Sequence, residues 1–94
     1  MLFDKMEHVN IYVTGKVQGV FFRRYAEMKA HELGVSGFVK NLPDGSVYIE
    51  AEGAMPALMK LVEWCRKGSP LSTVSDVRWE KGPYKNFVSF SMER

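Results

Sequence analysis

The stretch that decides the fold reads Gly15-Lys16-Val17-Gln18-Gly19-Val20-Phe21-Phe22-Arg23. Residues 9–14, just before it, alternate apolar and polar side chains, which predicts a half-buried strand. After it, residues 22–33 place apolar side chains on one helical face, and Gly34 is a helix stop signal. We therefore predict a strand, a glycine-containing turn and a helix start in this order.

A turn of this kind suits an anion. Glycine lets the backbone approach a ligand closely, and the free N–H groups and positive dipole end of a helix start favour a phosphate. Arg23, in the first turn of the predicted helix, can grip the anion with a two-pronged guanidinium. The spacing fits neither the Walker pattern nor GxGxxG, and such a turn taken alone is more often a simple connector.

The composition bounds the class of protein. The 94 residues are enough for one domain, and 46% hydrophobic with 26% charged residues is typical of a globular protein. A net charge of +2 is too small to indicate nucleic acid or an acidic membrane. The single cysteine, Cys65, fits a reducing compartment, and no apolar run approaches the roughly 20 residues of a membrane span. Because the first residues do not resemble a signal peptide, we expect a cytoplasmic protein.

The rest of the chain continues the alternation of strands and helices. Residues 1–7 carry no period and are predicted to be an extension that precedes one domain at 8–94. A second helix is predicted from near Met55 to the stop at Gly68, with Pro56 in its first turn. The remaining strands are predicted at 35–41, at 46–52 with Gly53 as the end, at 73–80 with Val77 and Trp79 facing inward, and at 87–92.

This order predicts an α+β, ferredoxin-like βαββαβ sandwich: an antiparallel or mixed sheet with two helices on one face and an extra C-terminal strand. In that topology the first two strands run parallel, with the third between them. Their C-terminal ends then lie at the same edge of the sheet, roughly 10 Å apart. We therefore expect Asn41, at the end of the second strand, to face the same site as the stretch from 15 to 23.

Few other side chains can do chemistry at this site. Asn41 precedes a Pro-Asp-Gly turn and can be an ordinary turn residue, or its amide can orient a water over the bound anion. His8 lies about 20 Å away along its strand and His31 about 12 Å along its helix, so neither can be a general base there. Cys65 falls in a core stripe, where a thiol acts as a small hydrophobe.

We expect neither a metal nor a cofactor, because no cluster of His, Cys, Asp or Glu has metal-ligand spacing. An anion cradle with one arginine and one amide, but no acid, base or nucleophile, can hydrolyse only an activated substrate. A phosphate on a carboxylic acid qualifies, since its leaving group is the base of an acid with a pKa near ~4.

Two motifs resemble the signatures of the acylphosphatases. The stretch from 15 to 23 is similar to G-x-V-Q-G-V-x-F-R. Residues 37–47, which read Gly37-Phe38-Val39-Lys40-Asn41-Leu42-Pro43-Asp44-Gly45-Ser46-Val47 and close at Gly53, are similar to G-F-V-x-N-x-x-x-G-x-V. Both stand in the expected order and spacing, and the likeness in length and element order runs from His8 onward.

The resemblance implies hydrolysis of a small acyl phosphate to a carboxylate and inorganic phosphate, without metal, cofactor or covalent intermediate. The family's phosphate-binding arginine corresponds to Arg23, its water-orienting asparagine to Asn41, and its cradle to the backbone from 15 to 23. Inorganic phosphate, as product, is expected to compete with substrate.

Two other functions share this fold. In an RNA-recognition domain, Tyr12, Phe38 and Tyr48 can stack bases on the open sheet face. Against it, Glu50 and Glu52 are predicted on the same face, and the strand lacks the RNA-recognition signature. The second is a non-catalytic anion-binding domain, which the presence of both Arg23 and Asn41 disfavours. We expect neither nucleic acid nor a membrane as partner.

Overall fold

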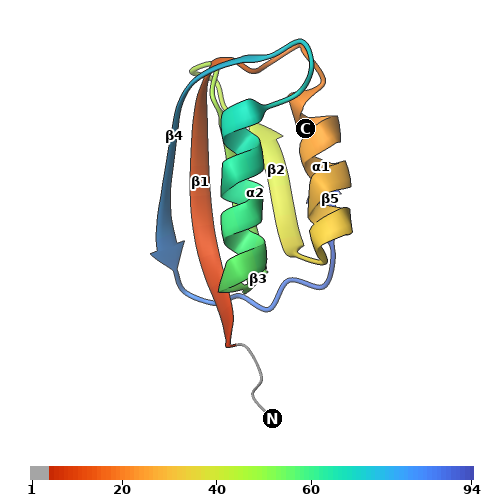
Figure 1. Cartoon of the computed structure of the whole chain (residues 1–94), viewed down its shortest axis with the longest axis vertical. Coiled ribbons are helices and arrows are strands. Elements are labelled where there is room, and N and C mark those ends of the chain that lie inside the picture. The colour runs from red at the N-terminus through yellow and green to blue at the C-terminus, as the bar shows by residue number, and fades with distance from the viewer. Residues whose placement is uncertain (1–4) are drawn as a thin grey trace.

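The computed structural model describes residues 5–94 and has the predicted ferredoxin-like architecture (Figure 1). In chain order its elements are β1 (Met6–Lys16), α1 (Phe22–Leu33), β2 (Ser36–Asn41), β3 (Val47–Ala54), α2 (Met55–Lys67), β4 (Thr73–Gly82) and β5 (Phe90–Met92). The strands form one sheet in the order β4-β1-β3-β2-β5, and both helices cover the same face. Among the strands of the described residues, only β5 pairs in parallel, with β2, so the sheet is mixed.

The core lies between the sheet and the helices. Across β1 and β3, Ile11 pairs with Ile49 and Val13 with Val47, and these side chains are fully buried. Phe22, at the start of α1, packs its ring against Trp64 of α2, with ring centroids 5.1 Å apart. The apolar face of the strands therefore packs against the apolar faces of the helices, as the alternation in the strands and the spacing in the helices predicted. Within residues 5–94, no helix is long and apolar enough to cross a membrane.

Three strands, β1, β3 and β4, extend further than predicted at the lower end of Figure 1, and β4 reaches Gly82. Strand β1 begins at Met6, inside the predicted extension, and Met6 and Glu7 pair with Ala54 and Gly53 of β3. Gly53 therefore does not end β3, because its backbone still has a partner across the sheet. The prediction of an extension at residues 1–7 otherwise concerns residues 1–4, which lie outside the described part of the chain.

The C-terminal part departs most from prediction. The last strand covers only Phe90–Met92, and residues 83–89, here called the crossing segment, run across the sheet from β4 to β5 (Figure 1). The backbone N–H groups of Lys85 and Phe87 donate to the carboxylate of Glu52, which draws the segment onto the face opposite the helices. Trp79 faces the helix side of the sheet, as predicted, where it lines a hollow with residues of α2, but it is 37% exposed because β4 is an edge strand.

The crossing segment also corrects the picture of the open face. Glu52 is fully buried, and its carboxylate accepts a hydrogen bond from His8 Nδ1 at 2.6 Å. Glu50 is nearly buried and pairs with Lys85 at 2.8 Å. The two glutamates are therefore not exposed charges that repel an RNA backbone, as the sequence suggested. Instead, Phe87 packs edge-on against Phe38 and covers part of the aromatic surface.

Candidate active site

The loop between β1 and α1 has the backbone pattern of an anion-binding turn. Gly19 and Phe21 have positive φ angles of 73° and 62°, whereas Val20 between them does not. Residues of positive and negative φ that alternate in this way can direct successive N–H groups into a concave nest. The loop leads directly into α1 at Phe22, so the positive end of the helix dipole lies at the same place. This loop of residues 17–21 is called the β1–α1 loop below.

Gly15 and Lys16, the first two residues of the predicted cradle, belong to the sheet. They pair with Val74 and Thr73 of β4, across a bulge between Thr14 and Gly15. A Cβ atom at Gly15 would collide with the backbone of Thr73 and Ser75. The close approach of two strands therefore requires this glycine, and neither Gly15 nor Lys16 lines the cavity described next.

One cavity brings Arg23 and Asn41 together. It has a volume of about 400 Å³, and its lining residues are Val17, Gly19, Phe21, Phe22, Arg23, Arg24, Asn41 and Met92. Arg23 comes from the first turn of α1 and Asn41 from the end of β2. Strands β1 and β2 both pair antiparallel with β3 and so run parallel to each other, as the topology predicted. Arg24 and Met92 were not predicted, since nothing in their local sequence marks them.

Three hydrogen bonds fix the β1–α1 loop on both sides. Gln18 Nε2 donates to the carbonyl oxygens of Leu42 and Ser46, at 2.8 and 2.9 Å. On the other side, Ser69 Oγ donates to the carbonyl of Val20 at 2.8 Å. The side chain of Gln18 is thus a tie between the loop and the β2–β3 turn. The contribution of Ser69 was missed, because its segment looked like an ordinary loop.

The guanidinium of Arg23 is held by the C-terminal end of the sheet. Its Nη1 donates to the carbonyl oxygen of Glu93 at 2.5 Å. Glu93 is placed in turn by a hydrogen bond from its N–H to the carbonyl of Val39, at 2.8 Å. Since a guanidinium has five N–H donors, this contact orients Arg23 while further donors remain for a phosphoryl group.

Asn41 carries an unusual polar atom. Its Oδ1 is buried and has no hydrogen-bond partner among residues 5–94. Buried polar atoms nearly always have a partner, so an exception in a cavity requires an explanation. Asn41 lines the cavity, and its amide has both an acceptor and a donor group for hydrogen bonds to a water or ligand.

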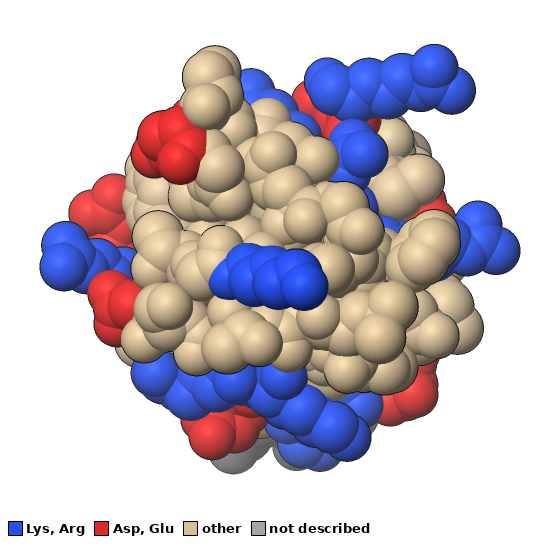
Figure 2. Space-filling view, turned by 90° about the horizontal axis from the view of Figure 1, so that it is seen from above, with Lys and Arg blue, Asp and Glu red and all other residues tan. Residues whose placement is uncertain are grey.

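The charge around the cavity favours an anion. Its lining residues, all within the described part of the chain, include two arginines and no carboxylate. Figure 2 looks onto this end of the molecule, where uncharged and basic side chains occupy the middle of the view and acidic ones lie toward its edge.

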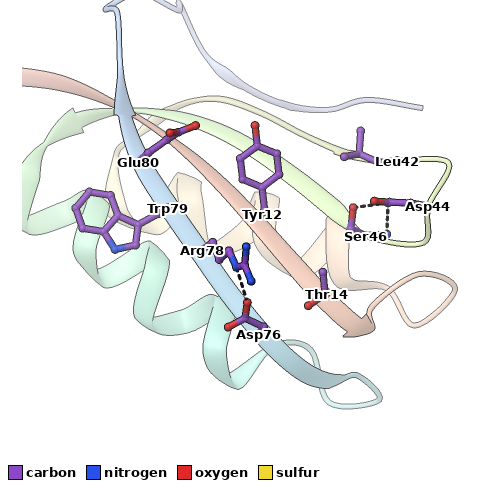
Figure 3. Close-up of a pocket in the computed structure, with 9 residues that line it drawn as sticks. All are labelled: Tyr12, Thr14, Leu42, Asp44, Ser46, Asp76, Arg78, Trp79 and Glu80. Atoms are coloured by element: carbon purple, nitrogen blue, oxygen red, sulfur yellow. Dashed lines mark hydrogen bonds and ion pairs between the residues drawn. The ribbon is translucent and has the colours of Figure 1, made fainter.

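A larger hollow, of about 760 Å³, lies elsewhere, on the sheet face opposite the helices (Figure 3). Its acidic lining residues are Asp44, Asp76 and Glu80, against one guanidinium from Arg78. Arg78 pairs with Asp76 at 3.0 Å. Hydrogen bonds from the side chain and backbone N–H of Ser46 lower the pKa of Asp44, which keeps this group anionic. Despite its size, this hollow repels a phosphate, and the smaller cavity is the candidate site.

The histidines and the cysteine lie away from the cavity. His8 contacts Glu52 and Asn10 in the buried network, and His31 Nε2 lies 3.1 Å from the carbonyl oxygen of Phe90. Cys65 is fully buried, which raises the pKa of its thiol. Among residues 5–94, no group of three or more His, Cys, Asp and Glu side chains is arranged to hold a metal ion. Metal independence remains a prediction.

The comparison with known proteins decides the family. The family model described as Acylphosphatase matches residues 9–92. The chain belongs to the acylphosphatase family. It is 54% identical over 72 residues to an acylphosphatase of Shewanella amazonensis, covering 77% of this chain and 79% of that protein. It is 45% identical over 91 residues to an acylphosphatase of Methylococcus capsulatus, covering 95% and 98% of the two chains.

A solved structure gives the same result for the fold. The acylphosphatase from Coxiella burnetii superposes with a TM-score of 0.91 at 40% identity, covering 94% of this chain and 93% of that one. These findings confirm the family and the ferredoxin-like fold predicted from the two motifs. They also identify the chain as an acylphosphatase, a hydrolase of acyl phosphates.

Proposed function

We propose that the β1–α1 loop and Arg23 hold the phosphoryl group of an acyl phosphate, while Asn41 orients the water that attacks it. The observation that carries the proposal is the shared cavity of Arg23 and Asn41. The amide of Asn41 also carries a buried oxygen, Oδ1, that has no hydrogen-bond partner among residues 5–94. An arginine and backbone donors suit the oxygens of a phosphate, and an amide that both accepts and donates suits a water.

The reaction is a direct displacement at phosphorus. The water oxygen forms a bond to phosphorus while the bond from phosphorus to the acyl oxygen breaks, and its electron pair stays on the departing carboxylate. One water proton remains on the new hydroxyl and the other passes to a phosphoryl oxygen of the substrate. An acyl phosphate dianion and water thus give a carboxylate and dihydrogen phosphate, with atoms and charge in balance.

The lining residues explain why only an activated phosphate reacts. None of them is an acid, base or nucleophile that can protonate a leaving group or form a phosphoryl-enzyme. A carboxylate departs without protonation, because the pKa of its acid is near ~4. Arg23 and the loop donors offset the charge that develops on the phosphoryl oxygens. Because the site holds water and substrate in the right geometry before they react, the entropic part of the activation barrier is smaller.

The proposal extends to partners and location. Inorganic phosphate carries the same oxygens as the transferred group, so it competes with substrate at Arg23. The basic lining supports an anionic substrate, and the volume of about 400 Å³ supports a small one in preference to a nucleic acid or a membrane. The cytoplasmic location predicted from the sequence belongs to the same proposal.

Hydrolysis of benzoyl phosphate in ¹⁸O-labelled water tests the direction of attack. Attack at phosphorus places the label in inorganic phosphate and leaves benzoate unlabelled. Label in benzoate would mean attack at the carbonyl carbon and would overturn the role given to Asn41. Phosphate binding without turnover would instead support a non-catalytic anion-binding domain.

A further inference from the structure

The mouth of the phosphate cavity carries two exposed apolar side chains from different elements. The Phe21 side chain, at the end of the β1–α1 loop, is 66% exposed, and that of Met92, in β5, is 40% exposed. Both line the cavity together with Arg23 and Asn41. An aromatic ring and a thioether on the rim of a polar site form a surface that contacts apolar groups well.

Folding does not account for the placement of Phe21. Its φ of 62° lies in the left-handed region, where a bulky residue is rare and strained and where glycine or asparagine is usual. Its backbone caps α1, but its side chain makes no capping hydrogen bond. The neighbouring Phe22 is buried in the core, whereas the ring of Phe21 gains little burial to offset the strain. Strain that the fold does not need is typical of functional sites.

The cavity also has room for more than a phosphoryl group. Its volume of about 400 Å³ is in the range of small-molecule sites. Once the phosphoryl oxygens contact Arg23 and the loop, the acyl part of the substrate must leave the polar end. Apart from Arg24, the remaining side chains of the lining are apolar, among them Val17, Phe21 and Met92, and no carboxylate among residues 5–94 lines the cavity.

We infer that Phe21 and Met92 form a subsite for the acyl group and favour acyl phosphates with aromatic or extended apolar acyl groups over small ones. The inference rests on the proposed function, because it takes the phosphoryl position from Arg23 and the β1–α1 loop. Phe21 supplies a ring face for stacking, and Met92 supplies a flexible side chain that adapts to the shape of the acyl group.

The test compares kcat/KM for benzoyl phosphate and acetyl phosphate, two substrates with the same phosphoryl group. The ratio of the two values should fall about 5-fold to 10-fold in Phe21→Gly, mainly through the KM of benzoyl phosphate. Glycine suits the left-handed backbone, and Phe21→Asn, which also tolerates it, should give the same fall. Phe21→Leu should retain most of the preference. Met92→Ala should change the ratio in the same direction, by about 2-fold or more.

The matched control is Met28→Ala, which removes an exposed methionine of α1 that does not line the cavity. Its ratio should equal that of the wild type. An unchanged ratio in the Phe21 and Met92 variants would overturn the subsite. So would equal losses for both substrates and for inorganic phosphate inhibition, since they would show that Phe21 only shapes the loop. Failure of the proposed function is distinguishable, because it appears as ¹⁸O in the carboxylate.

Discussion

The side-chain nitrogen of Gln18 donates a hydrogen bond to the carbonyl oxygen of Leu42, 2.8 Å away. Gln18 belongs to the loop that we propose holds phosphate, and Leu42 directly follows Asn41. A second hydrogen bond, to the carbonyl of Ser46 at 2.9 Å, closes the β2–β3 turn against the loop. This tie fixes the distance between the two halves of the candidate site, which come from elements far apart in sequence.

Loss of this tie should reduce both stability and activity. Gln18→Ala removes two side-chain hydrogen bonds, although the carbonyls of Leu42 and Ser46 each keep a backbone donor. The loss of the two bonds should lower the free energy of unfolding by about 1–3 kcal/mol. A misplaced loop should lower kcat/KM on the order of 10-fold to 10²-fold. Gln18→Glu keeps the shape but places a carboxylate against the two carbonyls, so it should be worse than alanine. Urea unfolding and steady-state kinetics measure both effects, and normal kinetics in Gln18→Glu would argue against the tie.

Substitution of Arg23 by lysine should be almost as damaging as substitution by alanine. The guanidinium contacts Glu93 with one nitrogen and keeps further donors for phosphate, whereas a single ammonium cannot make both contacts in the same geometry. Both variants should lose kcat/KM on the order of 10³-fold, and inorganic phosphate should inhibit them weakly. Arg66→Lys, on the exposed face of α2, is the matched control. Near-normal phosphate inhibition of Arg23→Lys would show that Arg23 contributes only its positive charge and not the geometry of its guanidinium.

Stability should fall in acid through Glu52. Burial alone would raise the pKa of Glu52, but hydrogen bonds from the Lys85 N–H, the His8 ring and the Phe87 N–H outweigh it and lower the pKa below the ordinary 4.5. A carboxyl with a lowered pKa stabilises the fold above its unfolded pKa, and this contribution disappears as the pH falls through the folded pKa. The loss should therefore begin as the pH drops below 4.5.

Glu52→Gln provides the comparison. It should cost about 1.5–3 kcal/mol near neutral pH, where the charged hydrogen bonds are present, and the difference from wild type should shrink below pH 4.5. Burial opposes the shift, but hydrogen bonds, above all from Lys85, lower the pKa of Glu50. The stability of Glu52→Gln should therefore still depend on pH to some extent, through Glu50. Glu63→Gln, which changes an exposed carboxylate of α2, is the control. A pH-independent difference between Glu52→Gln and wild type would contradict the assignment.

Chelation should leave turnover of benzoyl phosphate unchanged. The proposed mechanism assigns charge neutralisation to Arg23 and backbone donors, so excess EDTA removes nothing that the reaction uses. Alkyl phosphate monoesters should react at most marginally, because no lining residue can protonate an alkoxide. Activity that disappears in EDTA and returns with one divalent ion would refute metal independence, and similar rates on monoesters would reveal a missed acid.

The sequence was sufficient for the fold and for the convergence of the two motifs. The alternation of Val9, Ile11 and Val13 and the helical spacing of Phe22 and Ala26 specify which faces are buried. The handedness of the βα crossover then places β1 and β2 in parallel, which brings Arg23 and Asn41 into one cavity.

The contacts that fix the site were not predictable in the same way. Glu52 looked like a solvent-facing residue of an alternating strand, because the crossing segment that buries it has no periodic pattern of its own. The carbonyls of Glu93 and Leu42 are backbone groups, whose positions no residue motif specifies. Met92 reaches the cavity only because β5 pairs with β2, a contact between distant segments.

The division of labour between Arg23 and Asn41 is the central claim, and two constants measured on Asn41→Ala test it most directly. These are kcat for benzoyl phosphate and the inhibition constant for inorganic phosphate. Thermal unfolding must accompany them, since a loss of more than ~2 kcal/mol in stability would imitate a loss of catalysis. Asn41→Ser, which is polar but adds no charge to the cavity, then serves instead. We predict that kcat falls on the order of 10²-fold to 10³-fold while phosphate inhibits as in the wild type. Weakened phosphate inhibition with an unchanged kcat would place Asn41 in the phosphate site and contradict its role in orienting water.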